Sequence, residues 1–285
     1  MAEKNYRAEL VGVFGDPVDG NPTGVMEEAG FEAAGLNWRY LTCRVDVDNL
    51  EDAMRGMRAV GMRGVNLTMP HKVEVIRLLD ELSPAARIIG AVNTVVNRNG
   101  CLIGENTDGK GFVRSLTDEG LSPAGKVITL LGAGGAAKAI GVECALAGAR
   151  KINIINRNAA RGRELVQTIT ENTAAQAAFF PWEGAAPLPE DTEILINATC
   201  VGLFPDVDRC PDIRYEHIRP DMLVCDVVFN PAMPLFLRKA QAQGARIITG
   251  LGMLVNQAAL NFEIWTDVKA PREVMLHALM HEFET

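Results

Sequence analysis

Apolar and polar positions follow two different periods along this chain, and segments of the two kinds alternate from end to end. Apolar runs or two-residue alternation predict strands at 9–14, 38–45, 64–68, 126–132, 151–156, 193–199, 222–229 and 245–250. Helical spacing of apolar residues predicts helices at 24–35, 48–61, 135–148, 159–170, 233–243, 251–265 and 272–283. Asn99-Gly100 lies between two apolar runs within 91–106, which predicts a β-hairpin.

The alternation becomes most regular after residue 126, and this change suggests a second domain. Strands separated by helix-length segments imply right-handed crossovers and a parallel sheet. A chain of 285 residues also suggests two domains, at about 100–200 residues each. The segment 121–126 is a candidate linker, and a second boundary is expected near 250–252.

A glycine-rich turn follows the strand predicted at 126–132. The sequence "LLGAGGAAKAIG" has the spacing G-x-G-x-x-A, with Gly132, Gly134 and Ala137 at its three positions. The first glycine permits a tight turn, the second lets a pyrophosphate approach the backbone, and the small third residue lets helix and strand pack closely. The pattern therefore predicts a dinucleotide site at the start of the next helix.

The next strand of that unit ends in "INRNAAR". NAD-binding proteins usually have an Asp or Glu at this strand end, which binds the ribose 2′-hydroxyl, and this chain has neither. Asn156, Arg157 and Asn158 stand there, and Arg161 follows one turn later. Two guanidinium groups suit a 2′-phosphate, so we expect NADP, with NAD as the other possibility. The alternative is that both arginines are surface charges at a helix start.

The stretch "VNLTMPHK" places Lys72 directly after a strand and a turn. Thr68 is expected to cap a helix whose first turn contains Pro70 and Lys72. A cation is disfavoured by the helix dipole there, and the same field favours the neutral amine that can accept a proton. By position alone, a solvated lysine is the preferred interpretation.

Polar residues at other predicted element ends strengthen the case for a site. Asn93 lies among apolar neighbours in "GAVNT", Asp108 begins the helix after "ENTDG", and Gln257 lies on an apolar helix face. Asp108 as a plain helix cap is a serious alternative. Together with Lys72, these groups can hold vicinal hydroxyls and move one proton.

The chain resembles the shikimate/quinate dehydrogenase family over nearly its full length. The stretches that carry the resemblance are "GVNLTMPHK", "GAVNT", "GENTDG", "LLGAGGAA", "NRN", "INAT", "DVVFNP" and "GLGMLVNQAA". It implies an α/β fold with a substrate domain at 1–108, completed by 251–285, a Rossmann NADP domain at 109–250, and an active site between them. It also implies a role in aromatic amino acid biosynthesis.

The resemblance assigns roles to individual residues. Lys72 and Asp108 would be the catalytic pair, in which Lys72 takes the hydroxyl proton as hydride leaves and Asp108 orients it. The substrate would contact Asn21, Thr23, Thr68, Asn93 and Gln257. The cofactor would contact Gly132, Gly134, Gly135, Ala136, Asn156, Arg157, Asn158, Arg161, Thr199, Val228 and Gly250.

Two stretches depart from the family pattern. The family's S-x-S-P loop, whose serines bind the substrate carboxylate, reads Asn21, Pro22, Thr23, Gly24 here, and Asp16 and Asp19 add negative charge nearby. A tyrosine common in the family is Phe229 here, so one hydroxyl is absent. We therefore expect the chemistry to be retained and the substrate to be shikimate, quinate, aminoshikimate or another cyclic polyol. A sensor without turnover is the rival of another class.

Composition narrows the classes of partner. The formal net charge of −8 argues against a nucleic-acid surface, and six single cysteines without C-x-x-C argue against a zinc ribbon. No apolar run is long enough for a membrane span, and the N-terminus lacks a signal-peptide core. His277 and His281 are expected on a solvated helix face rather than at a metal. We expect a cytoplasmic monomer or homodimer that binds a small cyclic hydroxy acid.

Overall fold

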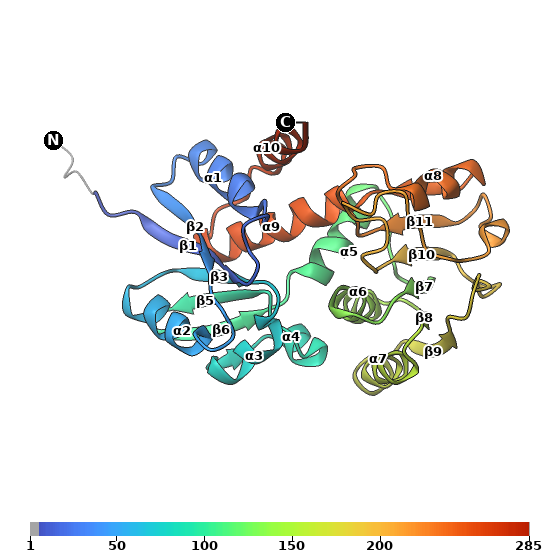
Figure 1. The fold of residues 1–285 in the computed structure, drawn as a ribbon. Helices are drawn as coiled ribbons and strands as arrows, with labels where there is room; N and C mark the ends of the chain where they lie inside the picture. The colour runs from blue at the N-terminus through green and yellow to red at the C-terminus, as the bar shows by residue number, and fades with distance from the viewer. Residues whose placement is uncertain (1–5, 285) are drawn as a thin grey trace. The chain divides into compact units, whose positions relative to one another are not determined.

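The computed structural model describes residues 6–284, which form two compact units (Figure 1). Unit 1 comprises residues 1–107 and 257–285, and unit 2 comprises residues 108–256. The segment 121–126 lies inside unit 2, so it does not link the two units as its composition had indicated. The predicted domain limits at 108 and 250 stay a prediction.

Unit 1 is built on a mixed sheet of six strands in the order β2-β1-β3-β5-β6-β4. β1 pairs in parallel with β2 and β3, whereas β5 is antiparallel to both β3 and β6. The strands are β1 (Glu9–Gly15), β2 (Trp38–Arg44), β3 (Gly64–Leu67), β4 (Glu81–Leu82), β5 (Thr94–Arg98) and β6 (Cys101–Glu105).

The predicted hairpin joins β5 and β6. Asn99 and Gly100 have φ values of 55° and 92°, which is the left-handed backbone that a two-residue hairpin turn requires. The Asn97 side chain accepts the Gly100 amide at 2.7 Å and closes the turn. The Asn-Gly pair therefore fixes the register of this antiparallel pair.

Helices cover the sheet of unit 1 on both faces. They are α1 (Thr23–Ala33), α2 (Leu50–Ala59), α3 (His71–Glu74), α4 (Pro84–Ile89), α9 (Gly250–Thr266) and α10 (Arg272–Glu284). The apolar side chains of α2 pack with Phe14, Val65 and Val95 in one core cluster. On α1, Phe31 stacks on Phe262 of α9 at 5.4 Å between ring centroids. A Cβ at Gly30 would lie 3.2 Å from that Phe262 ring, so the small residue permits this close packing.

Unit 2 is built on a fully parallel sheet of six strands in the order β12-β11-β10-β7-β8-β9. The strands are β7 (Val127–Leu131), β8 (Lys151–Asn156), β9 (Gln176–Pro181), β10 (Ile194–Asn197), β11 (Leu223–Asp226) and β12 (Arg246–Ile248). The order reverses between β7 and β10, which is the switch point where this architecture binds dinucleotides.

Alternate side chains of these strands face different helices. Leu131 and Val224 pack with Phe236 of α8 (Leu235–Ala242), whereas Leu130 packs near Gly141 of α6 (Gly135–Leu146). Figure 1 shows α8 on one side of the sheet and α6 with α7 (Ala159–Asn172) on the other. The remaining helix of unit 2 is α5 (Asp108–Asp118), which comes first in the chain. β7 and β8 are mostly apolar and buried on both faces, and their central polar residues, Thr129 and Asn153, are completely buried.

Candidate active site

Three predicted substrate or catalytic residues come together at the carboxyl end of β3. The Leu67 amide donates to the carbonyl of Asn93 at 2.8 Å, and the Val92 amide donates to the carbonyl of Lys72 at 2.7 Å. Thr68 follows Leu67 directly. These backbone bonds therefore hold Thr68, Lys72 and Asn93 close to the carboxyl end of β3.

Lys72 lies in α3, which is a single helical turn. The residue that precedes this turn is Pro70, and no side chain caps it. Thr68 contributes its carbonyl, which accepts the His71 amide at 2.9 Å. The prediction that Thr68 caps this helix is therefore wrong, because the helix begins three residues later, at His71.

His71 fixes the direction of this turn. Its ring is completely buried, and Nε2 lies 2.7 Å from the carbonyl oxygen of Val45. Since a carbonyl only accepts, Nε2 carries the proton. The neighbouring Lys72 is half-buried. Sequence reasoning had passed over His71 as one of four scattered histidines.

A buried hydrogen-bond network joins Asn93 to Gln257. The Asn93 Nδ2 donates to Thr107 Oγ1 at 2.9 Å, and this hydroxyl donates to Asn261 Oδ1 at 2.8 Å. Asn261 Nδ2 in turn donates to Gln257 Oε1 at 3.2 Å. The structure thus brings together two predicted substrate residues that are far apart in the chain. It also shows that Asn261 positions them, which sequence reasoning missed.

The same network continues across the sheet to β2. Thr94 Oγ1 donates to Asn261 Oδ1 at 2.7 Å and accepts Asn66 Nδ2 at 3.2 Å. The Tyr40 hydroxyl donates to Asn66 Oδ1 at 2.8 Å. Every one of these polar groups is buried, and satisfied buried networks of this kind hold side chains in one orientation.

Thr23 and Asn21 occupy the loop and first turn of α1. The Asn21 Oδ1 accepts the Thr23 amide at 2.9 Å, which leaves the Asn21 amide nitrogen as the group that can donate to a substrate. Thr23 is buried. Asp16 forms an ion pair with Arg44 at 2.9 Å, so part of the negative charge of this loop is neutralised.

Burial raises the pKa of Tyr40 well above its ordinary value. The charge of Glu27 raises it further, whereas a hydrogen bond from Thr23 lowers it. Tyr40 and Thr23 therefore share one buried environment with Glu27. The sequence signal for Glu27 was a single acid on the apolar face of α1, four residues after Thr23, and it was not used.

Asp108 is the first residue of α5, as its predicted position at a helix start requires. It is half-buried and belongs to unit 2, whereas Lys72 belongs to unit 1. A contact between the two side chains stays a prediction. In the sequence, Asp108 directly follows Thr107, whose amide donates to Asn93 Oδ1 at 2.8 Å.

The glycine-rich turn of unit 2 has the geometry that a phosphate requires. Gly132 has a φ of 108°, and a Cβ there would lie 3.0 Å from Thr199. Gly134 precedes α6 without a capping side chain, and Gly134 and Gly135 are exposed with open space around their Cβ positions. Ala137 is completely buried. The first amides of α6 can therefore approach an anion closely, and Ala136 lies within the same turn.

The end of β8 carries the residues expected to select the cofactor. Asn158 caps α7, since its Oδ1 accepts the Arg161 amide at 3.1 Å. Asn156 Nδ2 donates to the Asn158 carbonyl at 2.9 Å. Both asparagines thus shape this turn. Arg157 and Arg161 are exposed, and neither forms an ion pair within residues 6–284.

Thr199, Val228 and Gly250 follow the ends of β10, β11 and β12, respectively. Thr199 Oγ1 donates to Asn197 Oδ1 at 2.7 Å, and Asn197 Nδ2 donates to Asp226 Oδ1 at 2.9 Å. The Val228 amide donates to the same Asp226 oxygen at 3.0 Å. A Cβ at Gly250 would lie 2.5 Å from the Val228 carbonyl, so only glycine lets α9 begin here. These residues form one rim next to the glycine-rich turn.

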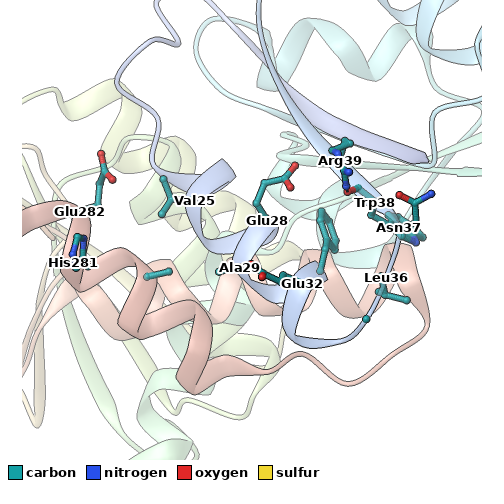
Figure 2. A pocket seen from close by; sticks show the side chains of 13 residues that line it. Val25, Glu28, Ala29, Glu32, Leu36, Asn37, Trp38, Arg39, His281 and Glu282 are labelled. Carbon is teal, nitrogen blue, oxygen red and sulfur yellow. The ribbon is translucent and has the colours of Figure 1, made fainter. Parts of the chain in front are cut away.

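A groove of about 800 Å³ is lined by residues of α1, the start of β2 and α10. Figure 2 shows the side chains that line it. The groove carries the polar side chains of Glu28, Glu32, Arg39, His281 and Glu282. None of the predicted site residues is among those that line it. The groove is therefore separate from the candidate active site.

The described residues contain neither a metal-binding cluster nor a membrane-spanning helix. No group of three or more His, Cys, Asp or Glu side chains within residues 6–284 is arranged to hold a metal ion. None of the helices in the described part of the chain is long and apolar enough to cross a membrane.

The chain matches two family models. The model of the "Shikimate dehydrogenase substrate binding domain" matches residues 13–95, and that of the "Shikimate 5'-dehydrogenase C-terminal domain" matches residues 250–280. A curated relative named shikimate dehydrogenase (NADP(+)), from Desulforamulus reducens, is 45% identical over 278 residues, which is 96% of each chain.

Two solved structures have the same fold over nearly the whole chain. The ligand-free 5-ketofructose reductase of Gluconobacter sp. strain CHM43 has a TM-score of 0.94 at 44% identity, with 98% of this chain and 100% of that chain covered. The shikimate 5-dehydrogenase of Listeria monocytogenes, in complex with shikimate and NAD, has a TM-score of 0.92 at 36% identity, with 98% and 99% covered.

Proposed function

The chain belongs to the shikimate dehydrogenase family, and from that premise we propose that it is an NADP-dependent dehydrogenase of shikimate or a close relative. Quinate and aminoshikimate are the close relatives we consider. The reaction converts a ring hydroxyl to the 3-dehydro ketone and back.

The observation that carries this proposal is the buried network that holds Asn93 and Gln257 beside the Lys72 turn. Amide groups at fixed positions suit the vicinal hydroxyls of a polyol. An amine at the same sheet edge suits the proton of one of those hydroxyls. A structural lysine at the surface would not need this arrangement around it.

Lys72 is proposed to exchange the proton of the reacting hydroxyl. In the oxidation, the O–H proton passes to the Lys72 amine while the carbinol hydrogen leaves as hydride, so that the C–O bond becomes a carbonyl. Bound NADP+ supplies the hydride acceptor. In the reduction, the Lys72 ammonium returns the proton to the new alkoxide. Thr68 is proposed to orient the substrate.

Asp108 is proposed to orient Lys72. The support comes from hydrogen bonds and chain connectivity. The Lys72 carbonyl accepts the amide of Val92, and Asn93 is the next residue in the chain. Asn93 Oδ1 in turn accepts the amide of Thr107, which directly precedes Asp108. A carboxylate placed there would stabilise the ammonium form of Lys72.

The cofactor is proposed to lie along the switch point of unit 2. The uncapped start of α6 suits the pyrophosphate, and the exposed Arg157 and Arg161 suit a 2′-phosphate. The rim of Thr199, Val228 and Gly250 is proposed to face the nicotinamide half. NADP is favoured over NAD for this reason, although NAD is named in the Listeria complex.

A second candidate substrate is a neutral polyhydroxy ketone of the 5-ketofructose kind. It is favoured by the high similarity to a 5-ketofructose reductase and by the loop in which Asn21 and Thr23 stand in place of two serines. The chemistry at Lys72 would be the same. The difference would lie at Asn21 and Thr23, which would bind the carboxylate of shikimate in the first case and neutral hydroxyl groups of the ketose in the second.

The test is a panel of substrates, with turnover measured from the absorbance of NADPH or NADH. Shikimate, quinate, aminoshikimate and cyclitols are offered with NADP+ or NAD+, and 5-ketofructose is offered with NADPH or NADH. We expect turnover of at least one of them, with NADP(H) preferred. A purified, folded protein that turns over none of them with either cofactor contradicts the proposal.

A further inference from the structure

Glu27 is a buried acid that the proposed chemistry does not use. Its side chain is 0% exposed in the middle of α1, and neither carboxyl oxygen has a hydrogen-bond partner among residues 6–284. Burial raises the pKa of this carboxyl well above its ordinary value. Buried carboxyl groups without partners are rare, because their desolvation is not compensated. An unpartnered one next to a binding site therefore points to a ligand group that completes it.

The surroundings of Glu27 connect it to the substrate loop. Thr23 lies one helical turn earlier on the same buried face of α1 and contacts Tyr40, whose hydroxyl bonds Asn66. The charge of Glu27 acts on Tyr40. We call Thr23, Glu27, Tyr40 and Asn66 the α1 polar cluster.

The other neighbours of Glu27 do not neutralise it. One turn later on α1, Gly30 packs on the ring of Phe262 and on Met275, which are apolar. Within the described residues, no lysine or arginine forms an ion pair with Glu27. The carboxyl thus lies where the polar cluster meets the apolar core, without a cation.

A carboxyl at this position changes which ligand the loop can accept. A substrate carboxylate bound against Thr23 can coexist only with the protonated form of Glu27, because two like charges repel strongly where water is excluded. A neutral substrate would instead place hydroxyl groups there. Each hydroxyl can donate to a Glu27 oxygen and satisfy it.

We propose that Glu27 is a specificity-determining residue that selects neutral polyhydroxy substrates over those that carry a carboxylate. This inference rests on the proposed function, because it takes Thr23 and its loop as the substrate side of the site. Within that function it favours a ketose such as 5-ketofructose over shikimate. Asn21 and Thr23 then serve as hydroxyl partners rather than as the family's pair of carboxylate donors.

The test compares two substrates in matched variants. Initial rates with shikimate plus NADP+ and with 5-ketofructose plus NADPH are measured for the parent, for Glu27→Gln and for Glu27→Met. The control is Glu32→Gln, which removes the same charge from an exposed position of the same helix. Binding of shikimate and of 5-ketofructose is measured by calorimetry on the same samples, and thermal unfolding checks the fold.

We expect Glu27→Gln to raise the ratio of kcat/KM for shikimate to that for 5-ketofructose by roughly tenfold or more, because glutamine cannot ionise beside a substrate carboxylate. The ratio of the two affinities should move in the same direction, and Glu32→Gln should leave both ratios unchanged. A parent enzyme that is active on either substrate, with ratios that stay the same in both Glu27 variants, overturns this inference and leaves the proposed function standing.

Two other outcomes also count against it. If neither Glu27 variant folds, the residue has a structural role and the inference is overturned. If the parent neither binds nor turns over any member of the panel, the proposed function fails first, and the inference fails with it.

Discussion

Arg157 and Arg161 place two exposed guanidinium groups at the turn that Asn156 and Asn158 shape. The asparagines hold the backbone, and the arginines are left to meet a ligand. This division of roles makes the cofactor preference a property of single side chains, which can be removed without loss of the turn.

The double variant Arg157→Ala/Arg161→Ala is expected to lower kcat/KM for NADP+ by roughly 10- to 100-fold, the range for lost charge-assisted hydrogen bonds. The value for NAD+ should change little, because NAD+ lacks the 2′-phosphate. Steady-state kinetics with both cofactors measure this. Arg163→Ala on the same helix, where the guanidinium stacks on Phe179, is the control and should not change the preference. Equal losses with both cofactors would contradict the assignment.

Sequence reasoning selected Lys72 and Asn93 as candidate site residues because each belongs to a short local motif. It missed Tyr40, Asn66 and Glu27 because their burial depends on packing between elements. The Tyr40–Asn66 bond, for example, joins two strands that are separated by a helix. No local pattern reveals such a pairing.

At the scale of elements, Asn261 is one of the side chains that join α9 to the sheet of unit 1. Asn261 Oδ1 accepts the hydroxyls of both Thr94 and Thr107, and its amide bonds Gln257. Removing this side chain leaves Asn93 Oδ1 as the acceptor for both hydroxyls, at 3.0 and 3.3 Å, and leaves the buried Gln257 Oε1 without the Asn261 donor.

We expect Asn261→Ala to lower the free energy of unfolding by about 1–3 kcal/mol, the cost of buried polar groups left without a partner. KM for the substrate should rise more than KM for NADP+, since Gln257 loses its orientation. Denaturant unfolding and kinetics measure the two effects. Asn172→Ala, at the exposed end of α7, is the control. Unchanged stability, or an equal rise in both KM values, would show that the network does not position the site.

Most elements were predictable because the periodicity of their apolar residues continues over many residues. β8 and α10 begin at the predicted residues, and the Asn-Gly hairpin is confirmed. α4 was missed although Ser83 caps it and Pro84 opens it, because six residues carry too little periodicity. β9 was missed as well, since "QAAFFP" resembles the end of a helix followed by a loop. The cap at Thr68 was wrong because one turn of helix is too short to reveal its start.

At the scale of the whole molecule, unit 2 holds an ionisable group deep in its fold. Asp226 at the end of β11 is 2% exposed, and burial raises its pKa from 3.8 to about 7. Hydrogen bonds from Val228 and Asn197 offset part of that effect. Because the folded-state pKa lies above the unfolded one, the protonated carboxyl is the form that folding favours.

Asp226 should therefore make the protein less stable as pH rises. Its contribution is fully present below about pH 4 and is lost as the pH approaches about 7, and by linkage it amounts to at most about 4 kcal/mol. Asp226→Asn cannot ionise, so its stability relative to the parent should rise between about pH 4 and pH 7 and stay level above. Denaturant unfolding across that range measures the difference. A constant difference would contradict the raised pKa.

The sequence predicted two units and a parallel sheet in the second, since helix-length segments between strands require crossovers. It could not give the strand order of either sheet, because pairing between strands such as β7 and β10 joins segments far apart in the chain. The antiparallel insertion of β5 beside β3 is known only from the structure, although the hairpin itself was predicted.

The central claim is that the Lys72 amine exchanges the substrate proton, and the most direct measurement is the turnover number of Lys72→Ala on whichever panel substrate the parent enzyme converts. We expect kcat to fall by about 10²–10⁴-fold, the usual contribution of a general acid–base group, with unfolding and NADP+ affinity unchanged. Lys269→Ala, at an exposed position after α9, should retain full activity. Turnover of Lys72→Ala at the parent rate would remove Lys72 from the chemistry and contradict this account.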